Sequence, residues 1–122
     1  MKSVAVIGAS NDRNKFGNKA VRAFAQQGFS VYPVNLTEHK IEGFPAFRSV
    51  LDVPIRPDLV SVYLPPKRVL EILPQVAQRG CGELWLNPGT ESDEVLAEAQ
   101  RLGLNVVAAC SIVAHGVSPS TL

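Results

Sequence analysis

The sequence has few cysteines, no long hydrophobic run and almost no excess charge, and each scarcity excludes a class of protein. Its two cysteines, Cys81 and Cys110, form no C-x-x-C pair and have no histidine pattern nearby, so neither a zinc site nor a disulfide framework is predicted. The net charge of +1 predicts no nucleic-acid partner and no membrane surface. Its apolar runs are far shorter than the roughly 20 residues that span a bilayer, and no signal-peptide core is seen. We therefore expect a cytoplasmic protein without a structural metal.

The composition is that of an ordinary globular protein. Over 122 residues, 46% are apolar and 19% are charged, which argues against disorder. This length is sufficient to bury a core without disulfides or metals. No internal repeat, low-complexity linker or change of composition divides the chain, so we expect residues 1–122 to form a single domain.

Five short apolar runs are continuous rather than alternating, which is typical of strands covered on both faces. They lie at residues 4–7, 31–34, 59–64, 84–86 and 106–109. Helical periodicity occurs between most of them, at residues 17–28, at 69–80 and from about Ser92 to Gly103. Ser92 or Thr90 is expected to cap the third helix, and Pro74 to kink the second.

This alternation predicts an α/β protein with a three-layer, Rossmann-like fold and a parallel sheet of five to six strands. We expect the five strands in the order 2-1-3-4-5. Residues 40–47 are expected to be irregular or to form a short extra edge strand beyond the second. A ligand would then bind at the switch point, outside the carboxyl ends of the first strand and its neighbours.

The loop after the first strand is similar to a nucleotide-binding loop, but its glycines are spaced differently. In VIGASNDRNKFGN, residues 6–18, Ser10 stands where a G-x-G-x-x-G fingerprint has its second glycine, and the next glycine is Gly17. Gly8 permits a tight turn, and the amides near Ala9, Ser10 and Gly17 can receive phosphate oxygens. The alternative is that Gly8 only makes a turn and Gly17 only packs against the sheet.

Charged residues give a second indication of the ligand. Residues 2–22 contain five basic residues and one acid, which favours an anionic ligand, although a solvated helix face explains some of them equally well. NAD-binding folds usually have an acid at the end of the second strand to hold the ribose hydroxyls. VYPVNL has Asn35 there instead, so NAD is disfavoured. Pro33 is expected near the end of this strand, where its missing N–H costs least.

Six motifs occur together in one order: VIGASNDRNKFGN, VYPVN, IEGFPAFRSVLDVP, VSVYLPP, GCGELWLNPG and ACSI. Together they resemble the small bacterial CoA-binding proteins and, more distantly, the N-terminal CoA-binding domain of succinyl-CoA ligase alpha subunits. Two positions depart from the family pattern. Leu36 replaces a common second proline, and AACSIV replaces a more basic stretch.

The resemblance implies that CoA is the ligand and assigns it a place. It implies that the pyrophosphate lies on Gly8, Ala9, Ser10 and Gly17, that Pro33, Val34 and Asn35 flank the nucleotide, and that Leu64, Pro65 and Pro66 pack near the adenine. Basic residues in the expected ligand-edge loops would face the 3′-phosphate of CoA. These are Arg13, Lys15, Lys40, Lys67 and Arg68, of which Arg13, Lys15 and Lys67 are included among the cofactor-binding residues.

No catalytic constellation is found in the sequence. Cys110 could face the CoA thiol and form a mixed disulfide with it, but a cysteine at such a place is more often a small core residue. Nothing near His115 in the sequence is expected to orient it as a base, and His39 is expected to be solvated. Trp85 is expected to pack on the sheet.

We therefore predict a non-catalytic protein that binds the nucleotide ligand CoA, or an acyl-CoA. The alternatives are an NAD(P)-binding redox-sensing or oxidoreductase module and a detached CoA-ligase subunit that acts with a protein partner. The sequence leaves open the acyl group, the biological role and the oligomeric state, including a homo-oligomer.

Overall fold

A parallel five-stranded sheet forms the centre of the computed structural model, which describes residues 2–122. The strands lie in the order β2-β1-β5-β6-β7, and each neighbouring pair is parallel. Their bounds are β1 Ser3–Ile7, β2 Ser30–Val34, β5 Leu59–Val62, β6 Glu83–Leu86 and β7 Val106–Ala108. The predicted α/β class, parallel sheet and strand order are all confirmed.

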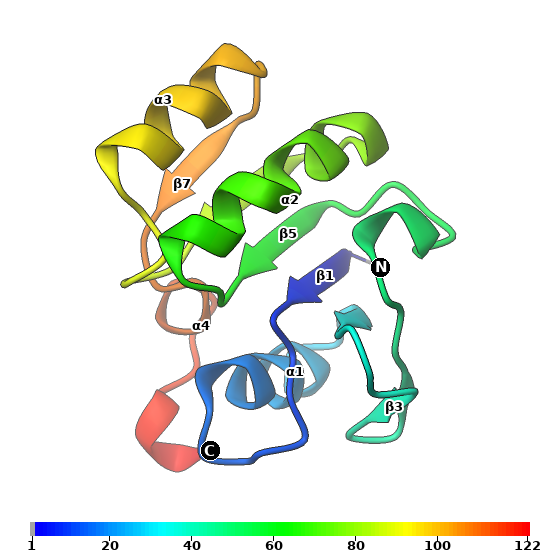
Figure 1. Cartoon of the computed structure of the whole chain (residues 1–122). Coiled ribbons are helices and arrows are strands. Elements are labelled where there is room, and N and C mark those ends of the chain that lie inside the picture. Colours follow the sequence, from blue (N-terminus) through cyan, green and yellow to red (C-terminus); the bar gives the residue numbers. More distant parts are fainter. Residues whose placement is uncertain (1) are drawn as a thin grey trace.

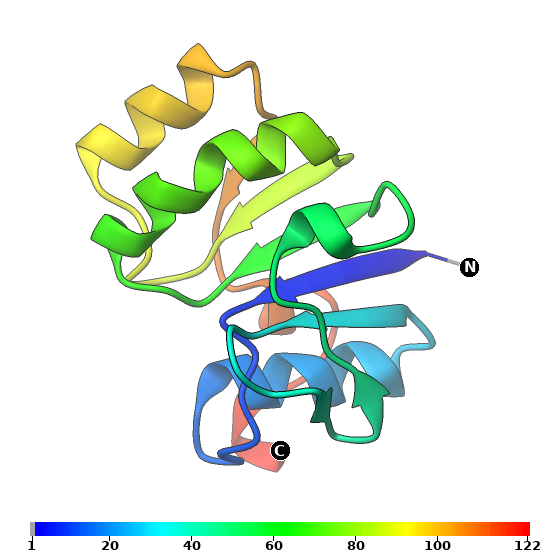
Figure 2. The same cartoon turned by 45° about the vertical axis from the view of Figure 1, so that its right-hand side comes forward.

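Helices cover both faces of this sheet, as Figures 1 and 2 show. α2 (Pro66–Arg79) and α3 (Asp93–Arg101) lie on one face, and α1 (Phe16–Gln26) and α4 (Ser111–Ala114) lie on the other. Alternate side chains of a strand point to opposite faces. Ala5 therefore packs in the cluster of α2 and α3, whereas its neighbours Val4 and Val6 pack in the cluster of α1.

The ends of the elements agree with the sequence signals in part. The hydroxyl of Ser92 accepts a hydrogen bond from the amide of Val95 and caps α3, as predicted. Pro74 stands inside α2 without ending it. The sequence did not predict α4, nor the 3₁₀ helices η1 (Val50–Asp52) and η2 (Pro119–Thr121).

Among residues 2–122, no helix has both the length and the apolar character needed to cross a membrane.

The third predicted strand, residues 59–64, is too long by two residues. β5 ends at Val62, although the amide of Tyr63 still donates to the carbonyl of Ile7 at 2.8 Å. Leu64 then leads into Pro65, the N-cap of α2, with Pro66 as its first residue. The ladder stops because the chain turns from the sheet into the helix within these residues.

Residues 40–47 were expected to be irregular or to form a short extra edge strand. They form two short strands and one isolated bridge to the edge of β2. β3 (Lys40–Ile41) and β4 (Phe44–Pro45) form an antiparallel hairpin that the sequence did not predict. Phe47 then pairs with the outer edge of β2 through an isolated parallel bridge to Val34. Pro33 lies in β2, which is the edge strand of the sheet. On the outer side of this strand, the amide of Phe47 donates to the carbonyl of Pro33 at 2.9 Å.

Candidate functional site

A cleft of about 1290 Å³ opens at the carboxyl ends of β1, β2 and β5. Its walls come from the loop between β1 and α1, the residues after β2, the residues around the start of η1, the first turns of α2 and the turn after β6. The chain crosses from β1 to β2 on one side and returns to β5 on the other side of β1. This is the switch point at which the sequence predicted a ligand.

Most of the predicted binding residues meet in this cleft. Those that line it are Gly8, Ala9, Ser10, Lys15, Gly17, Val34, Asn35, Leu64, Pro65 and Pro66. Arg13, Pro33 and Lys67 are not among its lining residues. Arg13 pairs with Glu42 at 3.7 Å, Pro33 is buried in β2, and Lys67 is exposed on α2. The structure thus brings the loop residues together and leaves these three outside.

The two glycines of the first loop are required by close packing within the chain. Gly8 has φ +89, and a Cβ on it would overlap the carbonyl oxygen of Tyr63. A Cβ on Gly17 would overlap the carbonyl oxygen of Gly8. Close backbone approach of this kind is possible only without a side chain. Gly17 thus packs against the residues that directly follow β1, and it also lines the cleft.

Free amide donors surround the start of α1. Among the described residues, the backbone N–H groups of Ala9, Ser10, Phe16 and Gly17 donate to no other group of the chain. The N-cap Lys15 makes no side-chain capping bond, and the first turn contains no acid. The orphan amides and the positive end of the helix dipole together suit an anion such as a phosphate.

Asn18 fixes the shape of this loop. It is fully buried, and its amide nitrogen donates to the carbonyl of Ser10 at 2.8 Å and to the carboxylate of Glu42 at 3.1 Å. Its oxygen accepts from Nε of Arg22 at 2.7 Å. We missed Asn18 in the sequence, although a polar residue beside Gly17 on the apolar face of a helix was a usable signal.

Asn35 joins the loop after β2 to the loop after β1. Its side-chain nitrogen donates to the carbonyl of Ala9 at 2.9 Å, and its oxygen accepts from the amides of Thr37 at 2.8 Å and Glu38 at 2.9 Å. Asn35 therefore positions both loops with its polar atoms and adds no negative charge where NAD-binding folds have an acid.

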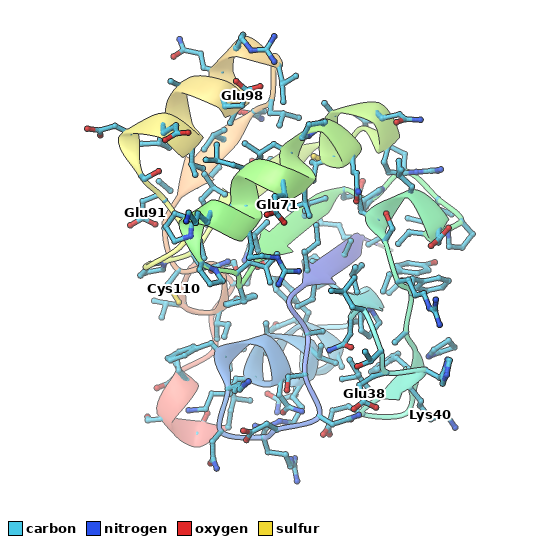
Figure 3. The ribbon with its side chains drawn as sticks, in the orientation of Figure 1. Glu38, Lys40, Glu71, Glu91, Glu98 and Cys110 are labelled. Atoms are coloured by element: carbon cyan, nitrogen blue, oxygen red, sulfur yellow. The ribbon has the colours of Figure 1, made fainter. Side chains whose placement is uncertain are left out.

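The charged lining of the cleft is mainly basic. Lys15, Arg48 and Arg68 line it together with one acid, Glu71, which pairs with Arg68 at 3.4 Å. Arg48 forms no ion pair with any residue in the described range 2–122. No local pattern in the sequence predicts a role for Arg48, because only the return of the chain past the edge of β2 brings it to the cleft. Lys40 lies in β3, well away from α2 and α4 (Figure 3).

A smaller pocket of about 290 Å³ adjoins the cleft. It is lined by Phe16, Tyr63, Asn87, Pro88, Cys110 and Pro119, and the first two residues and Pro88 also line the cleft. Cys110 is half-buried at the N-cap of α4 (Figure 3). The structure thus places this cysteine beside the cleft. A mixed disulfide at this position stays a prediction.

A buried polar network supports this pocket. Asn87 donates to the hydroxyl of Ser61 at 3.0 Å and to the carbonyl of Val62 at 2.9 Å, and its oxygen accepts from the amide of Ser111 at 2.9 Å. The hydroxyl of Ser111 lies 2.9 Å from that of Tyr63. Burial raises the pKa of Tyr63 above its ordinary value, and the hydrogen bond with Ser111 opposes this only in part. The sequence did not reveal this network.

His115 is oriented after all, which corrects the expectation from the sequence. Its Nδ1 lies 2.7 Å from the carbonyl oxygen of Ser111, and its ring packs against Phe24, Phe29 and Trp85 with centroid distances of 5.3, 5.7 and 5.3 Å. It lines neither pocket. His39 is exposed and Trp85 is buried on the sheet, both as predicted. Within residues 2–122, no three His, Cys, Asp or Glu residues gather as metal ligands.

Comparison with known proteins identifies the family. The chain belongs to the CoA binding domain family, whose model matches residues 2–116. The predicted resemblance and the predicted cofactor, CoA, are confirmed at this level.

Two relatives that share about a third of their aligned residues with this chain are much longer proteins. The chain is 31% identical over 117 residues to the alpha subunit of ADP-forming acetate–CoA ligase II of Pyrococcus furiosus, covering 87% of this chain and 26% of the relative. It is 38% identical over 109 residues to ADP-forming acetate–CoA ligase II of Archaeoglobus fulgidus, covering 86% and 16%. The chain thus spans about a quarter or less of the length of these relatives.

A solved structure of similar size has the same fold. It is a conserved hypothetical protein from Pyrococcus furiosus with a TM-score of 0.86 and 31% identity, and the match covers 93% of this chain and 99% of that one.

Proposed function

We propose that this chain binds CoA or an acyl-CoA in the cleft at the carboxyl ends of β1, β2 and β5, and that it has no catalytic activity of its own. One observation carries the proposal: in a member of the CoA binding domain family, free amides at the start of α1 and three cations line one cleft. Amides of this kind bind phosphate oxygens, and the cations match the charge of the ligand. We also propose that residues 1–122 form a single CoA-binding domain.

The pyrophosphate would lie at the centre of the cleft. The amides of Ala9, Ser10 and Gly17 would donate to its oxygens, and Lys15 would neutralise part of its charge. Gly8 would contribute by letting the chain turn beneath the phosphates. Pro33 would contribute indirectly, because it lies in β2 next to the lining residue Val34.

The adenosine would occupy the groove between the end of β2 and the start of α2. Val34 and Leu36 form one apolar wall of the cleft, and Leu64, Pro65 and Pro66 form another. Prolines present apolar surface without a backbone donor, which suits the face of an adenine ring. Arg48 lies on this side of the cleft, among the residues around the start of η1, and would pair with the 3′-phosphate of CoA.

The polar side chains around the site support the absence of catalysis. Asn35, Asn87 and Ser111 use their polar atoms in hydrogen bonds within the chain. His115 packs in an aromatic cluster outside both pockets. General acid–base chemistry needs a suitably placed titratable group within reach of the ligand, and the one carboxylate that lines the cleft, Glu71, is paired with Arg68. Cys110 carries the one thiol that lines either pocket in the described range.

A second candidate is a ligase component that acts with a partner chain. The names of the relatives, one of which is an alpha subunit, favour it. This role would use the same CoA cleft. Purification of the chain from its own cells would then yield a second protein in fixed proportion, whereas a stand-alone binding protein would elute without one.

Calorimetric titration of CoA, dephospho-CoA and NAD, each at low and high ionic strength, tests the proposal. We expect CoA to bind more tightly than dephospho-CoA, and both to bind more tightly than NAD. The preference for CoA should shrink as salt rises, because it rests on a screened charge contact. NAD binding at least as tight as CoA binding at both salt concentrations would favour the NAD(P)-binding alternative. Mass spectrometry of small molecules released from undialysed protein gives an independent check.

A further inference from the structure

The smaller pocket beside the cleft is uncharged and lies at one end of the proposed ligand path. Aromatic and proline rings, Cys110 and the amide of Asn87 form its lining. It opens toward the cleft at Phe16, the residue that directly precedes Gly17 at the start of α1. A ligand whose pyrophosphate rests on Gly17 therefore has this pocket within its reach.

The charges of the two regions determine which end of the ligand enters the pocket. Arg48 and Arg68 line the cleft on the side of β2 and α2, whereas the pocket is lined by no charged side chain. The nucleotide end of CoA carries the 3′-phosphate, and burying a charge without a partner is costly. The pantetheine end is uncharged and ends in a thiol or a thioester. The apolar pocket therefore fits the sulfur end of the ligand.

Part of the pocket wall is held in place by hydrogen bonds and rigid rings, which limits the size of the group that the pocket accepts. The hydroxyls of Tyr63 and Ser111 lie 2.9 Å apart, and Asn87 accepts from the amide of Ser111 at 2.9 Å. These bonds tie the residues that follow β5 and β6 to α4. Pro88 and Pro119 have rigid rings. The pocket has about 290 Å³, slightly less than the roughly 300–1,000 Å³ of complete small-molecule sites. There is room for a sulfur end with a short acyl chain.

We propose that this pocket receives the thioester end of a short-chain acyl-CoA and rejects long acyl chains. This inference rests on the proposed CoA site and specifies short-chain acyl-CoAs as its ligands. Phe16 is the wall that a longer chain would have to displace. Its side chain is 51% exposed, so it can be shortened without loss of the core.

Calorimetry with CoA, acetyl-CoA and octanoyl-CoA tests the inference on the wild-type chain and three variants. For the wild type we expect acetyl-CoA to bind within about threefold of CoA, and octanoyl-CoA at least about tenfold more weakly. Phe16→Ala should bring octanoyl-CoA to within about threefold of CoA, because it opens the pocket. Cys110→Leu should weaken acetyl-CoA about tenfold relative to CoA, because it fills the pocket.

Leu36→Ala is the matched control. Leu36 is the other strongly exposed apolar residue of the cleft, 62% exposed, but it does not line the pocket. Its loss should weaken CoA and octanoyl-CoA together and leave their ratio unchanged. Circular dichroism checks that each variant is folded.

The outcomes separate the two proposals. If the wild type binds neither CoA nor the acyl-CoAs, the proposed function fails. If CoA binds but octanoyl-CoA binds equally well, or if Phe16→Ala changes the ratio no more than Leu36→Ala does, the pocket is not an acyl site and the CoA cleft stands. Unchanged acetyl-CoA binding in folded Cys110→Leu also overturns the pocket assignment.

Discussion

Gly17 lies so close to the carbonyl oxygen of Gly8 that a Cβ on Gly17 would overlap that oxygen. Gly17 is the second residue of α1, and Gly8 directly follows β1. Their contact sets how the helix starts against the end of the strand. Gly17 therefore has a structural role at the junction of the loop and α1, in addition to lining the cleft.

Gly17→Ala should destabilise the protein as well as weaken CoA binding. The added methyl group forces the loop apart, and overpacking of this kind costs about 1–3 kcal/mol of unfolding free energy. Urea denaturation of the variant measures this loss. Gln26→Ala at the exposed end of α1 is the control and should change the unfolding free energy by less than about 0.5 kcal/mol. An unchanged urea midpoint for Gly17→Ala would show that the loop can relax around the methyl group.

Two substitutions at Asn35 should separate loop stability from ligand binding. Asn35→Ala loses the donor to Ala9 and the acceptor for the amides of Thr37 and Glu38, so we expect about 1–3 kcal/mol of lost stability. Asn35→Asp keeps the acceptor and should lose less stability. It also places a negative charge at the phosphates and should therefore weaken CoA at least as much as Asn35→Ala does. Calorimetry and urea denaturation of both variants check this. Equal losses of stability would contradict the assignment of the acceptor role.

The layered fold could be predicted because its determinants are local or topological. Continuous apolar runs identified the buried strands, and the Gly17–Gly28 stretch showed helical periodicity. The rule that crossovers are right-handed then led to the strand order. The hairpin between β3 and β4 gave no such signal, because its turn has Glu42 at φ 49, a conformation that favours glycine and that a glutamate rarely adopts.

The parts of the site that were missed depend on contacts between distant segments. Arg48 reaches the cleft because Phe47 bridges to Val34, a pairing that no local pattern announces. Asn87 meets Ser111 across 24 residues, and Ser61 meets Ser111 across 50. A single sequence shows polar residues at these positions but not that they form one network. Loop residues such as Ser10 could be assigned because they directly follow a recognisable strand.

Asp58 should make the stability of the protein sensitive to acid. Its carboxylate accepts hydrogen bonds from the amide of Ser3 at 2.8 Å and from the hydroxyl of Ser3 at 3.1 Å, and these bonds lower its pKa below the ordinary value of 3.8. As the pH falls, Asp58 therefore becomes protonated at a higher pH in the unfolded chain than in the folded protein. Its contribution to stability is therefore present above the ordinary pKa and is lost as the pH falls through the lower folded pKa.

Thermal unfolding of wild type and Asp58→Asn between about pH 7 and pH 3 measures this contribution. The variant should be less stable at neutral pH, and the gap in melting temperature should narrow below about pH 4. Because the two proteins are compared at each pH, the contributions of the other acidic groups to the pH dependence cancel. A gap that stays constant with pH would show that the charge of Asp58 is not what Ser3 stabilises.

Arg48→Gln should remove the preference for CoA over dephospho-CoA. The two ligands differ in the 3′-phosphate. Of the two lining cations that form no ion pair within the described chain, Lys15 and Arg48, only Arg48 lies beside the groove proposed for the adenosine. A partly exposed phosphate–arginine contact contributes on the order of 1 kcal/mol, so CoA should bind the variant several-fold to about tenfold more weakly at low salt. Dephospho-CoA should bind both proteins equally. The preference of the wild type for CoA over dephospho-CoA should fall as salt rises. The variant should bind the two ligands about equally at both salt concentrations.

Lys67→Gln is the informative partner for this measurement. The sequence placed Lys67 among the binding residues, but in the structure it is exposed on α2 and does not line the cleft. If the 3′-phosphate lies between Arg48 and the end of β2, Lys67→Gln keeps the wild-type preference at both salt concentrations. If Lys67→Gln removes the preference and Arg48→Gln keeps it, the phosphate lies at the first turn of α2. The adenosine would then have to lie outside the groove between Val34 and Leu64, because Arg48 borders that groove and Lys67 does not.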